Sequence, residues 1–332
     1  MENVAKKRMV SGIKPTGKLT LGNYIGAIKQ FIEYQNEYEM FVFIADLHAL
    51  TLPIEAKELR QNTKDLISLY LACGLDPEKV VLFKQSDVHE HAELGYIMAC
   101  MSNMGELSRM TQYKDKSSKL GSNESIPTGI YIYPTLMAAD IILYDPDYVP
   151  VGIDQKQHVE LTRDLALRFN ARYSDTFKIP EPVTAKRGAK VNSLSAPEKK
   201  MSKSESDKGT VYLLEDLAIT RKKIMSAVTD SDTSIVYDVE NKPGISNLLT
   251  IMSVLTNESI ESLVERFNGQ GYGTFKKAVA DVVCAELSEL QRKVKEIQSS
   301  GIIEKVLEDG AMKATYVARK KLAKVYRKVG LK

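Results

Sequence analysis

The chain has 332 residues, of which 43% are hydrophobic and 27% are charged, and its formal net charge is +3. These values are typical of a globular protein large enough for two domains, and the near-neutral charge does not by itself indicate a nucleic-acid binder. We expect no membrane span and no secretory signal, because no apolar run approaches roughly 20 residues and the first eight residues are polar. Three scattered cysteines fit neither a disulfide framework nor a zinc site, so we expect a reducing, cytoplasmic location.

The first predicted element is a short strand that leads through a glycine-containing turn into a helix. Apolar residues at Met9–Ile13 precede a break at Pro15–Gly17, and from Leu21 onward apolar residues recur at helical spacing. Such a turn offers backbone N–H groups and the positive end of a helix dipole to a phosphate. The P-loop pattern is excluded because Asn23 and Tyr24 follow the second glycine, and the glycine spacing excludes the dinucleotide fingerprint.

Apolar runs of strand length and helical patterns then alternate. The expected strands are residues 40–45, 80–83 and 148–151, and the expected helices are residues 54–73, 92–101, 134–144 and 157–170. This alternation predicts an α/β fold with a doubly wound parallel sheet, whose ligands bind beyond the carboxyl ends of the strands. Residues 113–129, which are rich in Lys, Ser and Gly, are expected to form a mobile loop.

The second part of the chain has a different character. Residues 179–207 are rich in Pro, Ser, Lys and Gly and are predicted to be linker and loop, whereas helices are expected at 215–228, 245–256, 258–268, 272–300 and 302–329. We therefore expect a nucleotide domain at 1–190, a loop and linker at 191–210 and a helical domain at 211–332, with the last helix available to pack back on the first domain. The basic blocks 186–203 and 313–332 would attract phosphates, although a solvated helix face explains the second block equally well.

Two short motifs resemble the signatures of class I aminoacyl-tRNA synthetases. Residues 20–23 (TLGN) resemble the HIGH box in the form used by the tryptophan and tyrosine enzymes, and residues 199–204 (KKMSKS) contain the KMSKS motif verbatim. Two lysines three residues apart on a serine-rich loop can neutralise charge as pyrophosphate departs. Each motif alone also fits an ordinary turn, but their order and their place between the α/β and helical parts favour the family.

Further segments resemble bacterial and mitochondrial tryptophanyl-tRNA synthetases along essentially the whole chain. These segments are residues 45–49, 105–114, 131–141, 149–166, 227–230 and 242–249. The resemblance implies a Rossmann-like nucleotide domain followed by an all-helical domain that binds the tRNA anticodon. It also implies a homodimer in which one tRNA spans both subunits.

The resemblance implies a two-step reaction. L-Tryptophan is activated with ATP and Mg²⁺ to tryptophanyl-adenylate and pyrophosphate, and tryptophan is then transferred to the 3′-terminal ribose of tRNA(Trp). The substrate carboxylate is itself the nucleophile, so catalysis consists of positioning and charge neutralisation. No residue is assigned to a metal, and we interpret His89 and His91 as a surface helix start rather than a metal pair.

Six residues are carried over by the resemblance as the tryptophan site: Asp140, Met137, Tyr133, His48, Gln155 and Val151. Asp140 would accept the indole N–H, because a carboxylate in an apolar helix needs a partner, although a cap or a buried ion pair is the alternative. Such an acceptor rejects phenylalanine but not tyrosine, which pocket shape must exclude. Met137 would pack on the indole, Tyr133 and Gln155 would hold the amino group, and His48 would line the pocket or be a core histidine.

The residues carried over as the ATP site are Lys14, Thr20, Gly22, Asn23, Gly152, Asp154, Lys116, Met201, Ser202 and Lys203. Gly22 would let the nucleotide approach the backbone closely, while Thr20 and Asn23 would act as neutral hydrogen-bonding groups. The residues expected to act in catalysis are Lys200, Lys203, Lys114 and Gln155. Lys114 and Lys116 would reach the pyrophosphate part of ATP, with ordinary surface charge as the alternative, above all for Lys116.

Two positions depart from the family pattern. Lys14 stands where relatives usually have Gln, and Ile153 stands where they usually have Glu. Lys14 can touch the α-phosphate or the substrate carboxylate, or point to solvent, and it is compatible with an auxiliary enzyme of altered inhibitor sensitivity. The alternative functions are a tyrosyl-tRNA synthetase, a catalytically retired RNA-binding regulator, and a small-molecule adenylylating ligase, which the long helical extension disfavours.

Overall fold

The centre of the molecule is a parallel sheet, seen in a computed structural model that describes residues 6–111, 113–114, 126–152, 155–184, 189–202 and 208–332. The sheet has five strands in the order β3-β2-β1-β4-β5, and neighbouring strands are parallel. The strands are β1 (Arg8–Ile13), β2 (Glu39–Ile44), β3 (Val80–Lys84), β4 (Tyr148–Val151) and β5 (Glu181–Thr184). The predicted doubly wound α/β sheet is confirmed: the chain adds strands on one side of β1 as far as β3 and then on the other side as β4 and β5, so the strand order reverses at β1.

Strand β5 was not predicted, since its residues fall in the segment interpreted as linker. It has only four residues and contains Pro182, which cannot donate to a ladder of hydrogen bonds. At the edge of the sheet this proline is tolerated, because only one side of β5 has to pair, and it pairs with β4.

Helices cover both faces of the sheet because successive strand residues point to opposite sides. Met40, Val42 and Ile44 of β2 enter one hydrophobic core, while Phe41 and Phe43 enter the other. The first core includes the continuous helical segment α1 (Leu21–Asn23), η1 (Tyr24–Ile28) and α2 (Lys29–Glu37), together with α4 (Ala56–Ala72). The second core includes α5 (Glu90–Met101), α8 (Thr128–Ile142) and α9 (Lys156–Tyr173). Short helices complete this part of the chain: α3 (Asp46–Ala49), η2 (Gln85–Asp87) and α6 (Met104–Ser108).

The start of α8 differs from the prediction. Tyr113 and Lys114, expected in a loop, are helical, and α8 begins at Thr128 with Pro134 in its interior. A proline inside a helix loses one backbone hydrogen bond, but α8 is buried along most of its length between α5 and α9. Tertiary packing therefore outweighs the local preference, and the rest of the expected loop, residues 115–125, lies outside the described residues.

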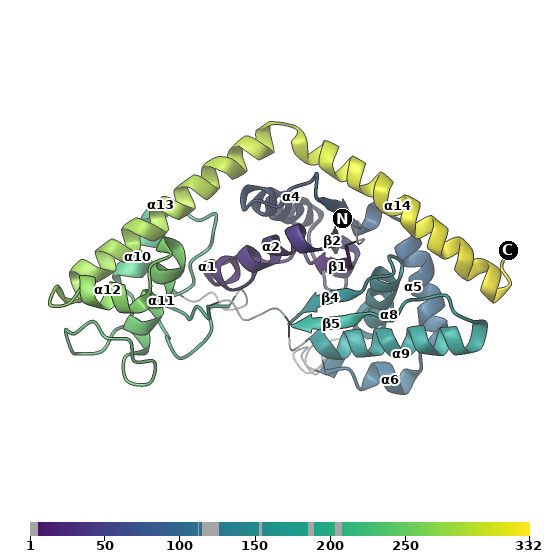
Figure 1. The fold of residues 1–332 in the computed structure, drawn as a ribbon, viewed down its shortest axis with the longest axis horizontal. Helices are drawn as coiled ribbons and strands as arrows, with labels where there is room; N and C mark the ends of the chain where they lie inside the picture. Colours follow the sequence, from purple (N-terminus) through teal and green to yellow (C-terminus); the bar gives the residue numbers. More distant parts are fainter. Residues whose placement is uncertain (1–5, 112, 115–125, 153–154, 185–188, 203–207) are drawn as a thin grey trace, which may run out of the picture.

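The second part of the chain is helical and forms the left half of Figure 1. Its helices are α10 (Leu217–Met225), α11 (Pro243–Thr256), α12 (Ile260–Arg266) and α13 (Gly271–Ser299). The chain turns at Gly301, whose φ is 73°, into α14 (Ile302–Val329), which runs back over the sheet along the edge strand β3. The two long helices α13 and α14 thus form an arch that joins the helical part to the sheet (Figure 1).

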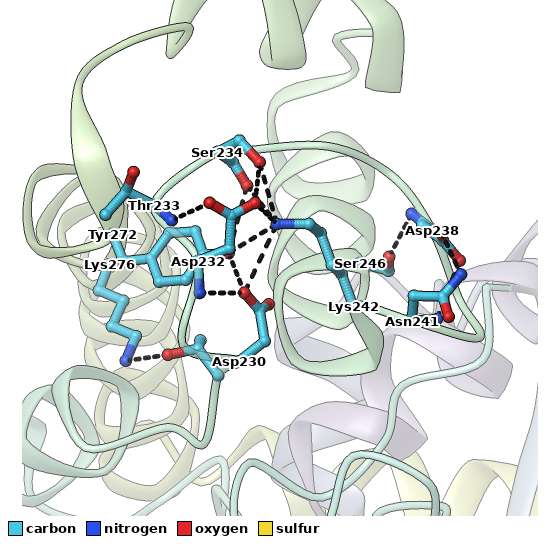
Figure 2. Close-up of polar contacts among 11 residues, drawn as sticks. Asp230, Asp232, Thr233, Ser234, Asp238, Asn241, Lys242, Ser246, Tyr272 and Lys276 are labelled. Atoms are coloured by element: carbon cyan, nitrogen blue, oxygen red, sulfur yellow. Dashed lines mark hydrogen bonds and ion pairs between the residues drawn. The ribbon is translucent and has the colours of Figure 1, made fainter.

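The connection between α10 and α11 is held by one lysine (Figure 2). The Nζ of Lys242 lies 2.6 Å from Oδ2 of Asp232 and donates to the carbonyl and hydroxyl oxygens of Ser234 at 3.1 and 3.0 Å. Tyr272 of α13 donates its hydroxyl to Asp230 at 2.6 Å. The hydrogen bond to Asp232 raises the pKa of Lys242, so this group stays charged and fixes the connection against α13.

Candidate active site

A cavity of about 430 Å³ opens beyond the carboxyl ends of β1 and β4, where the strand order reverses. This is the place at which an open α/β sheet binds its ligand, and the volume is within the roughly 300–1,000 Å³ of small-molecule sites. The structure brings all six residues of the predicted tryptophan site into its lining: His48, Tyr133, Met137, Asp140, Val151 and Gln155. Lys14 and Gly152 from the predicted ATP site also line it.

Asp140 is the centre of a buried hydrogen-bond network. Its side chain is fully buried, and Oδ2 accepts a hydrogen bond from Nε2 of His48 at 2.7 Å. Oδ1 accepts from Nε2 of Gln85 and from Nδ1 of His91, both at 2.7 Å. Burial alone would raise the pKa of Asp140, but the hydrogen bonds from the two histidines outweigh it and hold the pKa below its ordinary value. Asp140 is therefore an ionised acceptor at neutral pH.

His91 corrects the sequence interpretation. It was expected at a surface helix start, yet its side chain is fully buried and bonds Asp140 on one side and the hydroxyl of Tyr144, at 2.7 Å, on the other. The helical spacing of His91 with Leu94 and Met98, which are also fully buried, is the pattern that could have revealed this. Gln85 was missed as well, although it directly follows β3 at the edge of the sheet where ligands bind.

Tyr133 is held by a partner that the sequence did not indicate. Its hydroxyl donates to Nε2 of His158 at 2.7 Å, and burial raises the pKa of Tyr133, so the phenol stays protonated. The ring of Tyr133 lies edge-on to that of His48, with centroids 6.1 Å apart. Met137 stands four positions along the same helix, which places its side chain on the same face.

Lys14 is half-buried and lines the cavity. Its Nζ donates to the hydroxyl of Thr51 at 3.4 Å, and that hydroxyl donates to the carbonyl of His48 at 2.9 Å. The cation is therefore placed beside the short helix α3 that carries His48, within the lining of the cavity.

The turn that carries residues 20–23 is a capped helix start. Thr20 is fully buried, and its hydroxyl accepts a hydrogen bond from the backbone N–H of Asn23, while the side chain of Asn23 accepts from the backbone N–H of Thr20. This reciprocal capping box occupies both side chains. In the structure both side chains fix the turn, and their direct hydrogen bonding to ATP stays a prediction.

The KMSKS segment lies directly against this turn. Residues 191–201 fold into a hairpin-like loop, in which Met201 donates its N–H to the carbonyl of Val191 at 3.1 Å. Met201 is buried, and a Cβ added to Gly22 would lie 3.3 Å from the Cβ of Met201. Gly22 thus allows the two signature segments to approach each other, and they form adjoining walls.

The remaining predicted residues are divided. Lys114 and Lys200 are exposed and lie outside the lining of the cavity. Ser202 is half-buried, and its backbone carbonyl accepts a hydrogen bond from the hydroxyl of Thr210 at 3.5 Å. Asp154, Lys116 and Lys203 lie outside the residues that the structure describes, as does Ile153.

Within the described part of the chain, no helix combines the length and apolarity needed to cross a bilayer.

Comparisons with known proteins agree with this arrangement. Residues 2–288 match a family described as tRNA synthetases class I (W and Y). The chain is 51% identical over 329 residues to a tryptophan–tRNA ligase of Malacoplasma penetrans and 52% identical over 327 residues to one of Listeria monocytogenes, with 98% of each chain covered. It is also similar to the crystal structure of tryptophanyl-tRNA synthetase from Campylobacter jejuni complexed with ADP and tryptophan, with a TM-score of 0.86 and 38% identity. The match covers 97% of this chain and 99% of that one.

Proposed function

The chain belongs to the class I tRNA synthetases for tryptophan and tyrosine, and we propose that it is a tryptophan–tRNA ligase. It activates L-tryptophan with ATP to tryptophanyl-adenylate and pyrophosphate, and then transfers tryptophan to the 3′-terminal ribose of tRNA(Trp). The observation that carries this assignment is the ionised Asp140 in the wall of a cavity of about 430 Å³, in a chain about half identical to tryptophan enzymes along its whole length.

Tryptophan is bound in the cavity at the switch point. Asp140 accepts the indole N–H, and Met137 packs on the ring, where its thioether makes a favourable contact. Tyr133 and Gln155 face the amino group, and His48 both lines the pocket and holds Asp140. Phenylalanine would leave the acceptor position of Asp140 on the cavity side without a donor, which is the basis of its rejection.

ATP is bound between the capped turn and the KMSKS loop. Gly22 and Met201 adjoin there, and Lys200, Lys203 and Lys114 supply positive charge to the phosphates. Mg²⁺, when bound with ATP, would neutralise charge on the phosphates. The tryptophan carboxylate attacks the α-phosphorus, the bond to the bridging oxygen breaks, and pyrophosphate leaves. Lys14, beside the carboxylate, neutralises charge at that step.

The tRNA is read by the helical part, with residues 1–190 as the catalytic domain, 191–210 as the loop and linker, and 211–332 as the anticodon-binding domain. Part of the basic block on α14 has another use, because Arg319 binds Glu90 at 2.9 Å and Lys321 binds Asp145 at 2.5 Å. These two cations hold α14 on the start of α5 and on the segment between α8 and β4, and we assign phosphate contacts to other cations of the block.

The enzyme works in the cytoplasm as a homodimer that pairs through α5, α6 and α8. Tyr96, Met104 and Ile132 on these helices are large apolar side chains exposed by 74%, 73% and 43%. Tyr131 of α8 donates its hydroxyl to the carbonyl of Met104 at 2.5 Å, so α6 and α8 adjoin in one surface. An exposed apolar patch on a protein is typical of an interface. Sedimentation of the wild type and Met104→Asp tests this, with a dimer and a monomer expected, respectively.

The assignment is tested by ATP–pyrophosphate exchange with tryptophan and with tyrosine, followed by charging of purified tRNA. Exchange with tryptophan and charging of tRNA(Trp) are expected. Exchange with tyrosine alone would establish a tyrosyl enzyme instead, and RNA binding without any exchange would establish a retired regulatory relative.

A further inference from the structure

The hydrogen bonds of Asp140 leave room for one more donor. A carboxylate has about four acceptor positions on its two oxygens. Oδ1 receives two donors, from Gln85 and His91, and Oδ2 receives one, from His48, among the residues that the structure describes. His48 and Asp140 line the cavity, whereas Gln85 and His91 are fully buried behind the carboxylate. The remaining acceptor position is therefore on Oδ2, the oxygen on the cavity side.

The direction of each hydrogen bond behind the carboxylate is fixed. The ionised carboxylate of Asp140 can only accept, so Nδ1 of His91 donates to Oδ1. Nε2 of the neutral imidazole then accepts from the hydroxyl of Tyr144, which keeps its proton because burial raises the pKa of Tyr144 well above its ordinary value. Tyr144, His91 and Asp140 thus form a chain in which every donor points toward the carboxylate, and such chains strengthen each bond within them.

The side-chain amide of Gln85 is turned toward the carboxylate, and its own oxygen loses a hydrogen-bond partner as a result. Its Nε2 donates to Oδ1 of Asp140, which turns its Oε1 into a buried position with no hydrogen-bond partner among the described residues. A buried acceptor without a partner lowers stability. The orientation of this amide is therefore explained by what it does for Asp140, and stability alone does not account for it.

We propose that Gln85 and His91 are positioning residues that saturate Oδ1 of Asp140 and leave one acceptor on Oδ2 for the N–H of the substrate ring. This inference rests on the proposed function, because it assigns the control of ring recognition to two residues that do not touch the substrate. Without them the carboxylate is free to rotate and to seek other donors, so the ring N–H loses its dedicated acceptor.

The test compares tryptophan with β-(3-benzothienyl)alanine, in which sulfur replaces the ring N–H. ATP–pyrophosphate exchange with the full-length enzyme gives kcat/KM for both amino acids in the wild type, Gln85→Met and His91→Leu. In each variant the ratio of kcat/KM for tryptophan to kcat/KM for the analogue should fall about tenfold. The fall should come mainly from a higher KM for tryptophan, and the KM for ATP should not change. His91→Asn, whose amide N–H can replace Nδ1–H, should retain most of the preference.

Phe169→Leu is the matched control for a purely structural loss. Phe169 is fully buried in the core that also contains Phe43 and Phe83, the ring neighbours of His91, but it packs on Tyr173 and Phe177. This variant should lower thermal stability and activity with both amino acids while leaving their ratio unchanged. Gln85→Met, the milder change, decides the question if His91→Leu does not fold.

The possible failures are distinguishable. A wild type that does not activate tryptophan refutes the proposed function, and the inference with it. A wild type that uses both amino acids equally refutes the role of Asp140 as indole acceptor. A wild type that prefers tryptophan, with Gln85→Met and any folded His91→Leu retaining its full preference, overturns the positioning role alone.

Discussion

Alanine at position 310 should push the C-terminal helix away from the sheet. Gly310 lies where α14 crosses β3, and a Cβ added there would be 1.8 Å from the carbonyl oxygen of Leu82 and 2.7 Å from its carbonyl carbon. Ordinary non-bonded contacts need more than about 3.3 Å, so the helix must retreat by about 1.5 Å. The obstacle is backbone paired in a parallel sheet, and it cannot move aside as a flexible side chain would.

A displacement of this size weakens the packing of α14 along the core that it covers. Ala314, Ala318, Leu322 and Val325 of α14 are buried in the core behind the sheet. Overpacking alone usually costs about 1–3 kcal/mol. Because the buried side chains of α14 also lose contacts with this core, we expect Gly310→Ala to lower the free energy of unfolding by about 3 kcal/mol or more.

Gly273 provides the matched control, since it is also a helical glycine, in α13. An added Cβ there meets no atom within 4 Å among the described residues. Alanine should stabilise that helix by roughly 0.5–1 kcal/mol, because glycine loses more backbone entropy on folding. Thermal unfolding followed by circular dichroism measures both variants, and hydrogen exchange reports on the amides of α14. The reasoning is refuted if Gly310→Ala melts no lower than the wild type and α14 keeps its protection.

Three further predictions concern the site and the thiols. Gly22→Ala should raise the KM for ATP several-fold and leave the KM for tryptophan unchanged, because the new methyl group presses on the KMSKS loop; equal changes in both would contradict this. Burial, with the nearby carboxylate of Glu286, raises the pKa of Cys73 to about 12, so iodoacetamide at pH 8 should modify the exposed Cys100 first, as peptide mass spectrometry can show. The pKa of Asp140 is depressed in the folded state, so its stabilisation is complete above about pH 4 and is lost as the pH falls through the folded value. The difference in Tm between the wild type and Asp140→Asn should therefore narrow from pH 5 to pH 3, and a constant difference would be evidence against the shift.

The sequence predicts those elements whose local pattern agrees with their tertiary environment. Strand β2 is a continuous apolar run because it is buried on both faces, and periodicity alone places α13 and α14 within a residue or two. Strand β5 and the start of α8 were missed because Pro182, Gly129 and Pro134 indicate a break, whereas packing against neighbours decides the outcome.

The candidate site shows the same division. Asp140 and His48 are predicted because the resemblance assigns the roles of single family residues to matching positions of this chain. In the structure Nε2 of His48 lies 2.7 Å from Oδ2 of Asp140. Gln85 and His91 act through Asp140 rather than on a ligand, and no motif spacing connects positions from different helices. The capping box of the 20–23 turn is visible in the sequence only as polar residues three apart, which fits a ligand contact as well as a cap.

The two halves of the site are attached to different parts of the molecule. The cavity around Asp140 is built entirely from the sheet part, within residues 10–155. The loop that carries Lys200 is tied to the helical part, since Asn247 of α11 accepts the N–H of Asn192 at 2.8 Å and donates to its carbonyl at 3.0 Å, and Val228 donates to Leu194 at 2.8 Å. The KMSKS loop therefore contacts both the helical part, through Asn192 and Leu194, and the turn of residues 20–23, through Met201, whereas the amino-acid cavity belongs to the sheet part alone.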